Sequence, residues 1–254
     1  MARLALFGAG FTGSHIATAL QRLGWKVDAI GRETPAAAVE AALAQATHVL
    51  STVPPSEDHD PVLASYGGAV RRADWIGYLS STGVYGDTNG AWVDESAALT
   101  GRRGGRITAD EAWQAIGARV FRLPGIYGPG RAPLDRLRAG QAHRIDLPGQ
   151  VFCRIHVGDI VAGVLAAIAR GPAGVYNLAD DLPAPQNDVV AYGCRLLGLP
   201  VPPLRTLDQL DLSPAARAFY SENRRVANGK AKRLLGWRPR YPTYREGLAA
   251  VLRA

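Results

Sequence analysis

A cluster of glycines near the start of the chain most constrains how it can fold. Gly8, Gly10 and Gly13 form a G-x-G-x-x-G pattern between an apolar run at residues 4–7 and a helix-length segment at residues 12–23. The first glycine permits a tight turn, the second lets a pyrophosphate approach the backbone, and the third lets the helix pack closely on the strand. The diphosphate then binds the amides of the helix N-terminus. The pattern predicts a dinucleotide site, rather than a purely structural turn, at Gly8, Gly10, Phe11, Thr12 and Gly13.

Strand and helix patterns alternate along most of the chain. We expect strands at residues 4–7, 26–30, 48–52, 75–80, 119–123 and 175–177, and helices at residues 12–23, 35–46, 61–70, 109–116 and 157–169. This alternation predicts an α/β protein with a Rossmann-type, doubly wound parallel sheet. Proline and glycine are denser after Pro124. We therefore expect one domain over residues 1–254, with a small C-terminal substrate-binding region that covers the sheet edge, mainly at residues 125–150 and 178–245.

The end of the second expected strand indicates which dinucleotide fits. A carboxylate at this position binds the ribose hydroxyls of NAD and repels the 2′-phosphate of NADP. Asp28 has the usual sequence distance from the glycines but lies in mid-strand, whereas Gly31 and Arg32 follow the strand end. Since an arginine can pair with a 2′-phosphate, we expect NADP. NAD, with Arg32 as an ordinary surface residue, is the alternative.

Composition argues against several other classes of protein. The 254 residues are 47% hydrophobic, enough to bury a full core. The net charge is +7, but the arginines are scattered, which disfavours a nucleic-acid interface. Cys153 and Cys194 are too few for a disulfide framework or a metal site, and we find no export or membrane segment. We expect a cytoplasmic monomer or homodimer with a small-molecule substrate and no metal, nucleic-acid or membrane partner.

Later motifs, in the right order, resemble those of the extended short-chain dehydrogenase/reductases, the group of NAD-dependent epimerases and dehydratases. They are the segments SSTGVYG (80–86), RLPGIYGPG (122–130), RIHVGDI (154–160) and LGWRP (235–239), with Asn177 ending a YN strand. The resemblance covers nearly the whole chain. It implies that Ser51, Thr52 and Val53 line the cofactor cleft and that Ser81 matches the catalytic serine or threonine. A serine that merely caps the strand end is the alternative for Ser81.

The chain departs from this family at its catalytic pair. The family uses a tyrosine, with a lysine four residues later, to move a proton while hydride moves to or from the nicotinamide. No Y-x-x-x-K occurs here; Arg102 falls at the tyrosine position and Arg106 at the lysine position. Because a guanidinium has a pKa above about 12, Arg102 cannot shuttle a proton, whereas Arg106 can hydrogen-bond the ribose. The chain thus resembles the atypical members, which keep the cofactor fold without this pair.

Other groups are candidates for the missing roles. Tyr85, four residues after Ser81, is a candidate proton donor, with a core or substrate-wall role as the alternative. Arg154, Arg122 and His156 are candidate substrate ligands; the alternatives are solvated arginines and a histidine that holds a loop. Two functions remain open. One is an NADP-dependent oxidoreductase or epimerase/dehydratase-like enzyme for a small polar substrate, including phosphorylated or nucleotide-linked ones; the other is a catalytically silent NADP-binding sensor or regulatory protein.

Overall fold

The computed structural model describes residues 2–253, apart from the side chains of residues 215 and 216. A six-stranded parallel sheet forms its centre, in the order β10-β6-β4-β3-β1-β2. The strands are β1 (Arg3–Phe7), β2 (Lys26–Ile30), β3 (His48–Ser51), β4 (Trp75–Ser81), β6 (Arg119–Leu123) and β10 (Gly174–Asn177). The strand order reverses between β1 and β3. Ligands of open α/β sheets bind at such a reversal, beyond the carboxyl ends of the strands.

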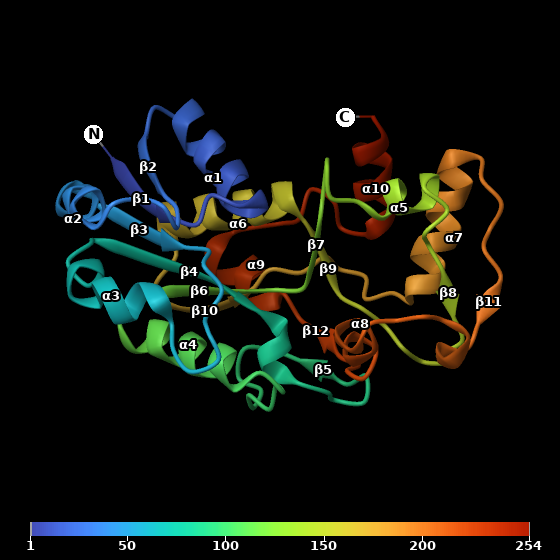
Figure 1. Ribbon diagram of the computed structural model, residues 1–254. Coiled ribbons are helices and arrows are strands. Elements are labelled where there is room, and N and C mark those ends of the chain that lie inside the picture. Colours follow the sequence, from blue (N-terminus) through green and yellow to red (C-terminus); the bar gives the residue numbers. More distant parts are fainter. Residues whose placement is uncertain (1, 254) are drawn as a thin grey trace.

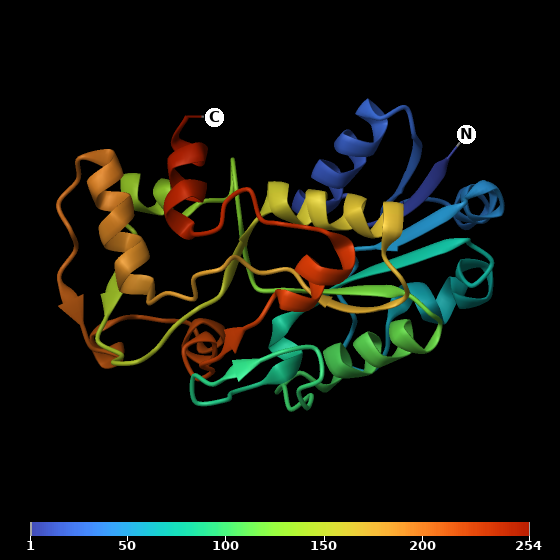
Figure 2. The ribbon, with the colours of Figure 1, turned by 180° about the vertical axis from the view of Figure 1, so that it is seen from behind.

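Helices cover both faces of this sheet (Figures 1 and 2). One face carries α1 (Phe11–Arg22), α6 (Val157–Arg170) and α9 (Gly229–Leu235), and the other carries α2 (Ala36–Gln45), α3 (Pro61–Val70) and α4 (Gly104–Ala115). Alternate residues of β1 face opposite sides: Leu6 packs in the cluster under α1 and α6, and Phe7 in the cluster under α2 and α3. Because both faces are buried, the sequence of this strand over residues 4–7 is an uninterrupted run of apolar residues.

A second group of elements lies beyond the carboxyl ends of the strands, on the right of Figure 1. Its helices α5 (Pro133–Arg138), α7 (Gln186–Leu197) and α10 (Tyr244–Leu252) share an apolar cluster that includes Leu134, Val189 and Leu248. The short elements around them are η1 (Thr82–Tyr85), β5 (Trp92–Val93), β7 (Gly125–Tyr127), β8 (Arg144–Ile145), β9 (Arg154–His156), β11 (Leu204–Arg205), η2 (Leu207–Gln209), α8 (Pro214–Phe219) and β12 (Arg225–Val226). These elements form the wall that faces the sheet.

The structure confirms the α/β fold and the six expected strands and five expected helices. One boundary is wrong: α4 begins at Gly104 rather than at residue 109, because two glycines hide the start of the helical pattern. The sequence reading did not assign α7 and α10, which lie in the part rich in proline and glycine. Between residues 2 and 253, no helix has the length and apolar character needed to cross a bilayer.

Candidate active site at the carboxyl edge of the sheet

The turn between β1 and α1 has the geometry that its glycines predict. Gly8 has φ +84°, a conformation that side chains disfavour. A Cβ on Gly13 would lie 2.2 Å from the carbonyl oxygen of Gly8, so only glycine lets α1 pack this closely on the turn. A Cβ on Gly10 would meet nothing within 4 Å. The space above Gly10 is therefore open. The positions of Gly8 and Gly13 are closed, because a side chain at either would meet neighbouring atoms.

The N-terminus of α1 presents unpaired amides to this open space. The helical ladder starts where the Ser14 amide donates to the Gly10 carbonyl at 2.9 Å. The amides of Phe11, Thr12 and Gly13 have no acceptor among the described residues. Gly10 provides no side-chain cap, and the first turn carries no acidic residue. Such a helix end attracts an anion.

The end of β3 borders the same turn. The Thr52 hydroxyl donates to the Gly8 carbonyl at 2.6 Å, and its amide donates to the Phe7 carbonyl at 2.9 Å. Ser51 is fully buried, and its hydroxyl accepts from the Val53 amide at 3.3 Å. Residues 51–53 thus lie beside the glycine turn, and Thr52 holds the turn in place directly.

Asp28 is occupied in the middle of β2. It is paired with Ala5 across the ladder, and Arg3 binds its carboxylate through two guanidinium nitrogens, one of them at 3.0 Å. The strand ends at Ile30, and the exposed Arg32 follows after Gly31. The cationic side chain, rather than the carboxylate, therefore lies at the end of β2.

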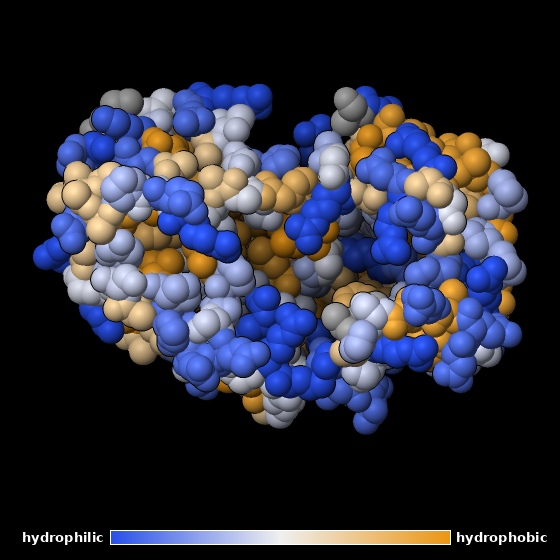
Figure 3. Space-filling model, viewed as in Figure 1, coloured by the Kyte–Doolittle hydropathy of each residue, from blue (hydrophilic) through white to orange (hydrophobic). Residues whose placement is uncertain are grey.

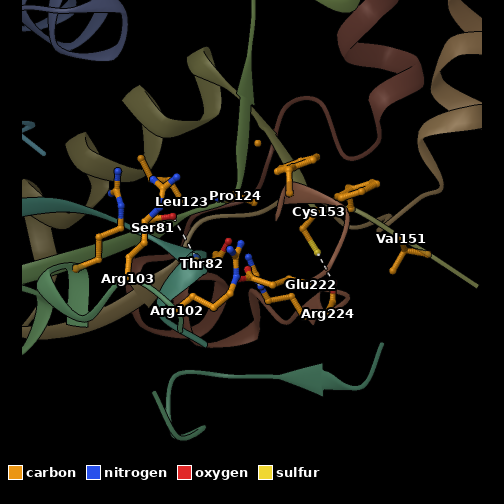
Figure 4. A pocket seen from close by; sticks show the side chains of 15 residues that line it. Ser81, Thr82, Arg102, Arg103, Leu123, Pro124, Val151, Cys153, Glu222 and Arg224 are labelled. Carbon is orange, nitrogen blue, oxygen red and sulfur yellow. Dashed lines mark hydrogen bonds and ion pairs between the residues drawn. The ribbon is translucent and has the colours of Figure 1, made fainter. Parts of the chain in front are cut away.

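A cavity of about 270 Å³ lies at the carboxyl ends of β4 and β6. The surface is hollowed between the sheet and the second group of elements in Figure 3. Figure 4 shows side chains that line the cavity, and they come from five parts of the chain. The lining consists of Ser81, Thr82 and Gly83; Arg102, Arg103 and Arg106; Leu123, Pro124 and Gly125; and Val151, Phe152, Cys153, Phe219, Glu222 and Arg224.

Ser81 and the residue at the tyrosine position have different surroundings in this cavity. The Ser81 hydroxyl accepts from the Gly83 amide at 3.1 Å, so it caps η1, and its own proton has no acceptor among the described residues. Arg102 is half exposed and donates to the Glu222 carboxylate and the Ala218 carbonyl, both at 2.7 Å. Arg224 binds the same carboxylate at 2.7 Å. Burial raises the pKa of Glu222, but the hydrogen bonds from Arg224 and Arg102 outweigh it, and the pKa is lowered.

The structure places Tyr85 and Arg122 in a buried network instead of on the cavity. Tyr85 is 1% exposed; its hydroxyl donates to Asn177 at 2.7 Å and accepts from Arg122 at 3.0 Å. Arg122 also binds Asp110 through two contacts of 2.7 and 3.1 Å. Burial raises the pKa of Tyr85. The geometry therefore disfavours Tyr85 as a proton donor and Arg122 as a substrate ligand, because the groups that would react are already bonded.

Arg154 lines a second cavity, of about 460 Å³, which shares Gly125, Phe152, Cys153 and Phe219 with the first. Its guanidinium is 8% exposed and donates to the Phe152 and Ala184 carbonyls and to Gln186, at 2.8 to 3.0 Å. Burial lowers the pKa of Arg154. Arg154 thus shapes the wall of the second cavity, with its donors directed to the protein.

His156 has a structural environment. Its Nδ1 accepts from the Gly158 amide at 3.1 Å and caps α6, and its ring contacts Tyr127 and Tyr241. The residue is 6% exposed and lines neither cavity. Burial, with smaller repulsion from His15 and Arg240, lowers its pKa to about 4. The expectation that His156 binds substrate is therefore not supported; the histidine holds a helix end.

Sequence reasoning missed Phe152, Cys153, Phe219, Glu222 and Arg224. They line the first cavity but lie far along the chain from Arg102, Arg103 and Arg106 and belong to no motif that the sequence shows. Phe152 stacks on Phe219 with ring centroids 4.6 Å apart and planes 3° apart. Only the return of the chain past the sheet edge brings these side chains together.

The environment of His156 makes stability depend on pH. The unfolded state, with a histidine pKa of 6.5, binds more protons than the folded state between pH 6.5 and about 4. Stability is therefore lost as the pH falls through this range. His156→Asn keeps a side chain that can cap the helix without titrating. We expect wild type to lose about 1–2 kcal/mol relative to this variant between pH 7 and pH 5, measured by urea unfolding.

The exposed residue His59 supplies the control, His59→Asn, which should follow wild type at both pH values. Parallel pH dependence of wild type and His156→Asn would show that burial does not disfavour the imidazolium form of His156.

Comparison with known proteins gives two curated relatives of this chain. No family model matches it. A 3-diazoavenalumate denitrifying reductase from a Streptomyces species is 31% identical over 140 residues, 51% of this chain and 45% of the reductase. The chain thus matches less than half of that relative's length. Protein YeeZ of Escherichia coli (strain K12) is 26% identical over 250 residues, 81% of this chain and 87% of YeeZ.

Solved structures match over the whole chain. A conserved protein of unknown function from Silicibacter pomeroyi DSS has a TM-score of 0.91 and 44% identity, covering 100% of this chain and 99% of that one. The dTDP-glucose 4,6-dehydratase of Bacillus anthracis, in complex with NAD, has a TM-score of 0.81 and 16% identity over 100% and 96% of the two chains. The human epimerase family protein SDR39U1, with NADPH, has a TM-score of 0.79 and 17% identity over 99% of each chain. The chain therefore belongs to one family with the Silicibacter pomeroyi protein, and its fold is that of the NAD-dependent epimerase/dehydratase group, the extended short-chain dehydrogenase/reductases.

Proposed function

We propose that this protein is an NADP-dependent oxidoreductase that acts on a small polar substrate in the cavity beside Ser81. The observation that carries the proposal is the glycine turn at the strand-order reversal. Its closed positions, Gly8 and Gly13, bring three unpaired amides of α1 to an open space above Gly10. That space fits the diphosphate of a dinucleotide, which needs close approach to the backbone and several amide donors.

The residues present fit the diphosphate and one ribose of such a cofactor. The diphosphate would contact Gly8, Gly10, Phe11, Thr12 and Gly13. Ser51, Thr52 and Val53 would border it at the end of β3, and Arg106, at the lysine position, would donate to a ribose. Two proteins with the same fold are described in complex with NAD and with NADPH.

The end of β2 favours NADP over NAD. A carboxylate that bound the ribose of NAD would have to lie at the strand end, but Asp28 lies in mid-strand and is bound by Arg3. The Arg32 side chain is exposed to solvent just beyond the strand end. Its guanidinium can pair with a 2′-phosphate through two parallel hydrogen bonds.

We assign a reduction to this cavity. A reduced nicotinamide dinucleotide, when bound, supplies a hydride. Ser81 would donate its free hydroxyl proton as a hydrogen bond to an acceptor atom of the substrate, while Gly83 orients the hydroxyl from the other side. Arg102 replaces the usual tyrosine and stays cationic, so it supplies charge and not a proton. A relative of this chain is named a reductase, which agrees with this assignment. Arg154 would shape the part of the second cavity that holds the substrate. The proposed substrate class includes phosphorylated and nucleotide-linked compounds.

A catalytically silent NADP-binding sensor is the second candidate function. It is favoured by the loss of the tyrosine–lysine pair and by the burial of Tyr85, whose hydroxyl is bonded on both sides. A protein that binds the cofactor without turnover needs only the glycine turn and a surface that responds to it. The two functions share the dinucleotide site and differ only at Ser81 and its cavity.

Two glycine variants test the dinucleotide site. Gly10→Ala has room for its methyl group and an allowed backbone conformation, φ −72° and ψ −165°, so stability should change by less than about 0.5 kcal/mol. The methyl group would occupy the open space, so NADPH affinity, measured by fluorescence titration, should fall about tenfold or more. Gly13→Ala, which clashes with the Gly8 carbonyl, should instead lower stability by about 1–3 kcal/mol. Unchanged NADPH binding by a folded Gly10→Ala variant, or no binding by wild type, would refute the site.

Arg32 should decide the cofactor preference. Arg32→Ala removes the partner of the 2′-phosphate and should weaken NADPH binding about 10- to 100-fold, while NADH binding stays unchanged. Arg22→Ala, at the far end of α1, removes the same charge away from the site and serves as control. Equal losses of NADPH and NADH affinity in Arg32→Ala would contradict a 2′-phosphate contact.

Ser81 separates the enzyme from the sensor. In assays with NADPH and a panel of carbonyl compounds and sugar nucleotides, Ser81→Ala should lower kcat about 100-fold without changing NADPH affinity. Ser81→Thr keeps a hydroxyl at the same position and should retain most of the activity. Tight NADPH binding without turnover of any compound in the panel would instead support the sensor.

A further inference from the structure

The first cavity carries an excess of positive charge. Arg102, Arg103, Arg106 and Arg224 line it, and Glu222 is the one carboxylate in the lining. Glu222 already binds Arg102 and Arg224. Arg103 and Arg106 have no acceptor for their guanidinium groups within the part of the chain that the structure describes. Charge balance therefore leaves these two cations available to an anionic ligand.

A stacked pair of aromatic rings lines the same cavity. Phe152 and Phe219 lie parallel at 4.6 Å, and Tyr220 meets both rings edge-on at 5.7 Å. Phe219 is 56% exposed although it is part of this cluster. It lines both cavities, so the exposed part of its ring borders them. A planar ligand group can stack on the exposed face of Phe219 or meet its ring edge-to-face. Aromatic pairs in these geometries are stabilised by more than the burial of their surface area.

The residue at the tyrosine position holds this aromatic surface in place. Arg102 donates to the carbonyl of Ala218, the residue before Phe219, and to Glu222, three residues after it. Arg102, Glu222 and Arg224 lie together at one side of the cavity in Figure 4. The guanidinium thus ties the segment that carries Phe219 to the start of α4. Arg102, at the position expected for the tyrosine, thus joins two walls of the cavity.

We propose that the substrate is a small planar anion: an aromatic or conjugated ring that lies against Phe219 and Phe152 and bears a carboxylate or phosphate that pairs with Arg103. The proposal rests on the oxidoreductase function above and names its substrate class. The cofactor diphosphate does not account for these cations, because no residue of the glycine turn lines the cavity. Arg106 is assigned to the cofactor ribose, so among the described residues that line the cavity Arg103 remains as a cation without a protein acceptor.

Binding of matched probes to the NADPH-loaded protein tests the substrate class. The probes are cinnamate, cinnamamide, which has the ring without the charge, and 3-cyclohexylpropanoate, which has the charge without a planar ring. Phenyl phosphate distinguishes phosphate from carboxylate, and UDP-glucose represents a nucleotide sugar. We expect cinnamate or phenyl phosphate to bind about tenfold more tightly than each of the other three.

Variants locate the two contacts. Phe219→Ala should weaken binding of the planar anion about fivefold. Trp92→Ala, which removes an aromatic ring that is 60% exposed outside both cavities, should leave binding unchanged. Arg103→Ala should weaken the planar anion about tenfold but leave cinnamamide unaffected, and Arg103→Lys should restore part of the loss. Arg72→Ala, an exposed arginine at the opposite end of the sheet, is the matched charge control.

The outcomes separate the two proposals. If NADPH binds but no planar anion binds saturably, or if cinnamamide, 3-cyclohexylpropanoate or UDP-glucose binds as tightly as the planar anions, the substrate class is wrong and the cofactor site stands. If wild type binds no nicotinamide dinucleotide, the oxidoreductase function itself fails. Loss of planar-anion binding in Trp92→Ala or Arg72→Ala, with NADPH binding intact, would show that the cavity is not where the anion binds.

Discussion

The contact between Gly13 and the carbonyl of Gly8 is the constraint on which the site depends. Because no side chain separates them, α1 starts directly at the carboxyl end of β1, with its first amides at the point where the strand order reverses. Thr52 holds the same carbonyl from the end of β3. Two neighbouring strands and one helix therefore converge on a single backbone oxygen. An anion bound at the helix N-terminus would lie next to residues from both strands.

The cavity beside this turn forms because later segments of the chain come back to the carboxyl edge of the sheet. The strands β4 and β6 provide Ser81 and Pro124 at their ends, and the start of α4 with the residues just before it provides three arginines. The opposite wall comes from residues 151–153 and 219–224. Ion pairs between Arg102, Glu222 and Arg224 connect the walls. An ion pair with a half-exposed partner, such as Arg102 with Glu222, contributes little to stability, but it sets the position of the aromatic wall.

The loss of the tyrosine–lysine pair changes what the cavity can do. The geometry disfavours Tyr85 as a substitute for the missing acid, because its hydroxyl is shared between Asn177 and Arg122 in a fully buried network with Asp110. Buried polar groups of this kind are costly unless all of them are bonded, so the network is a structural unit. The Ser81 hydroxyl proton has no acceptor among the residues that the structure describes, and the arginines supply charge. Under the proposed function, these groups would orient and polarise an anionic substrate, and the bound cofactor would supply the hydride.

Local pattern in the sequence determined the sheet, its covering helices and the glycine turn. Apolar runs such as Leu4 to Phe7 can only be buried on two faces, and Gly8 and Gly13 occupy positions where a side chain is strained or clashes. Local pattern also placed Asp28 in mid-strand. It could not show that Arg3 binds Asp28, that Tyr85 and Arg122 are buried together, or that His156 lies between two tyrosines. Nor could it bring Phe219 and Glu222 to the arginines at the start of α4 and just before it, more than 100 residues away. Those contacts join segments without any shared period or motif, and only the packing of the folded chain decides which of them meet.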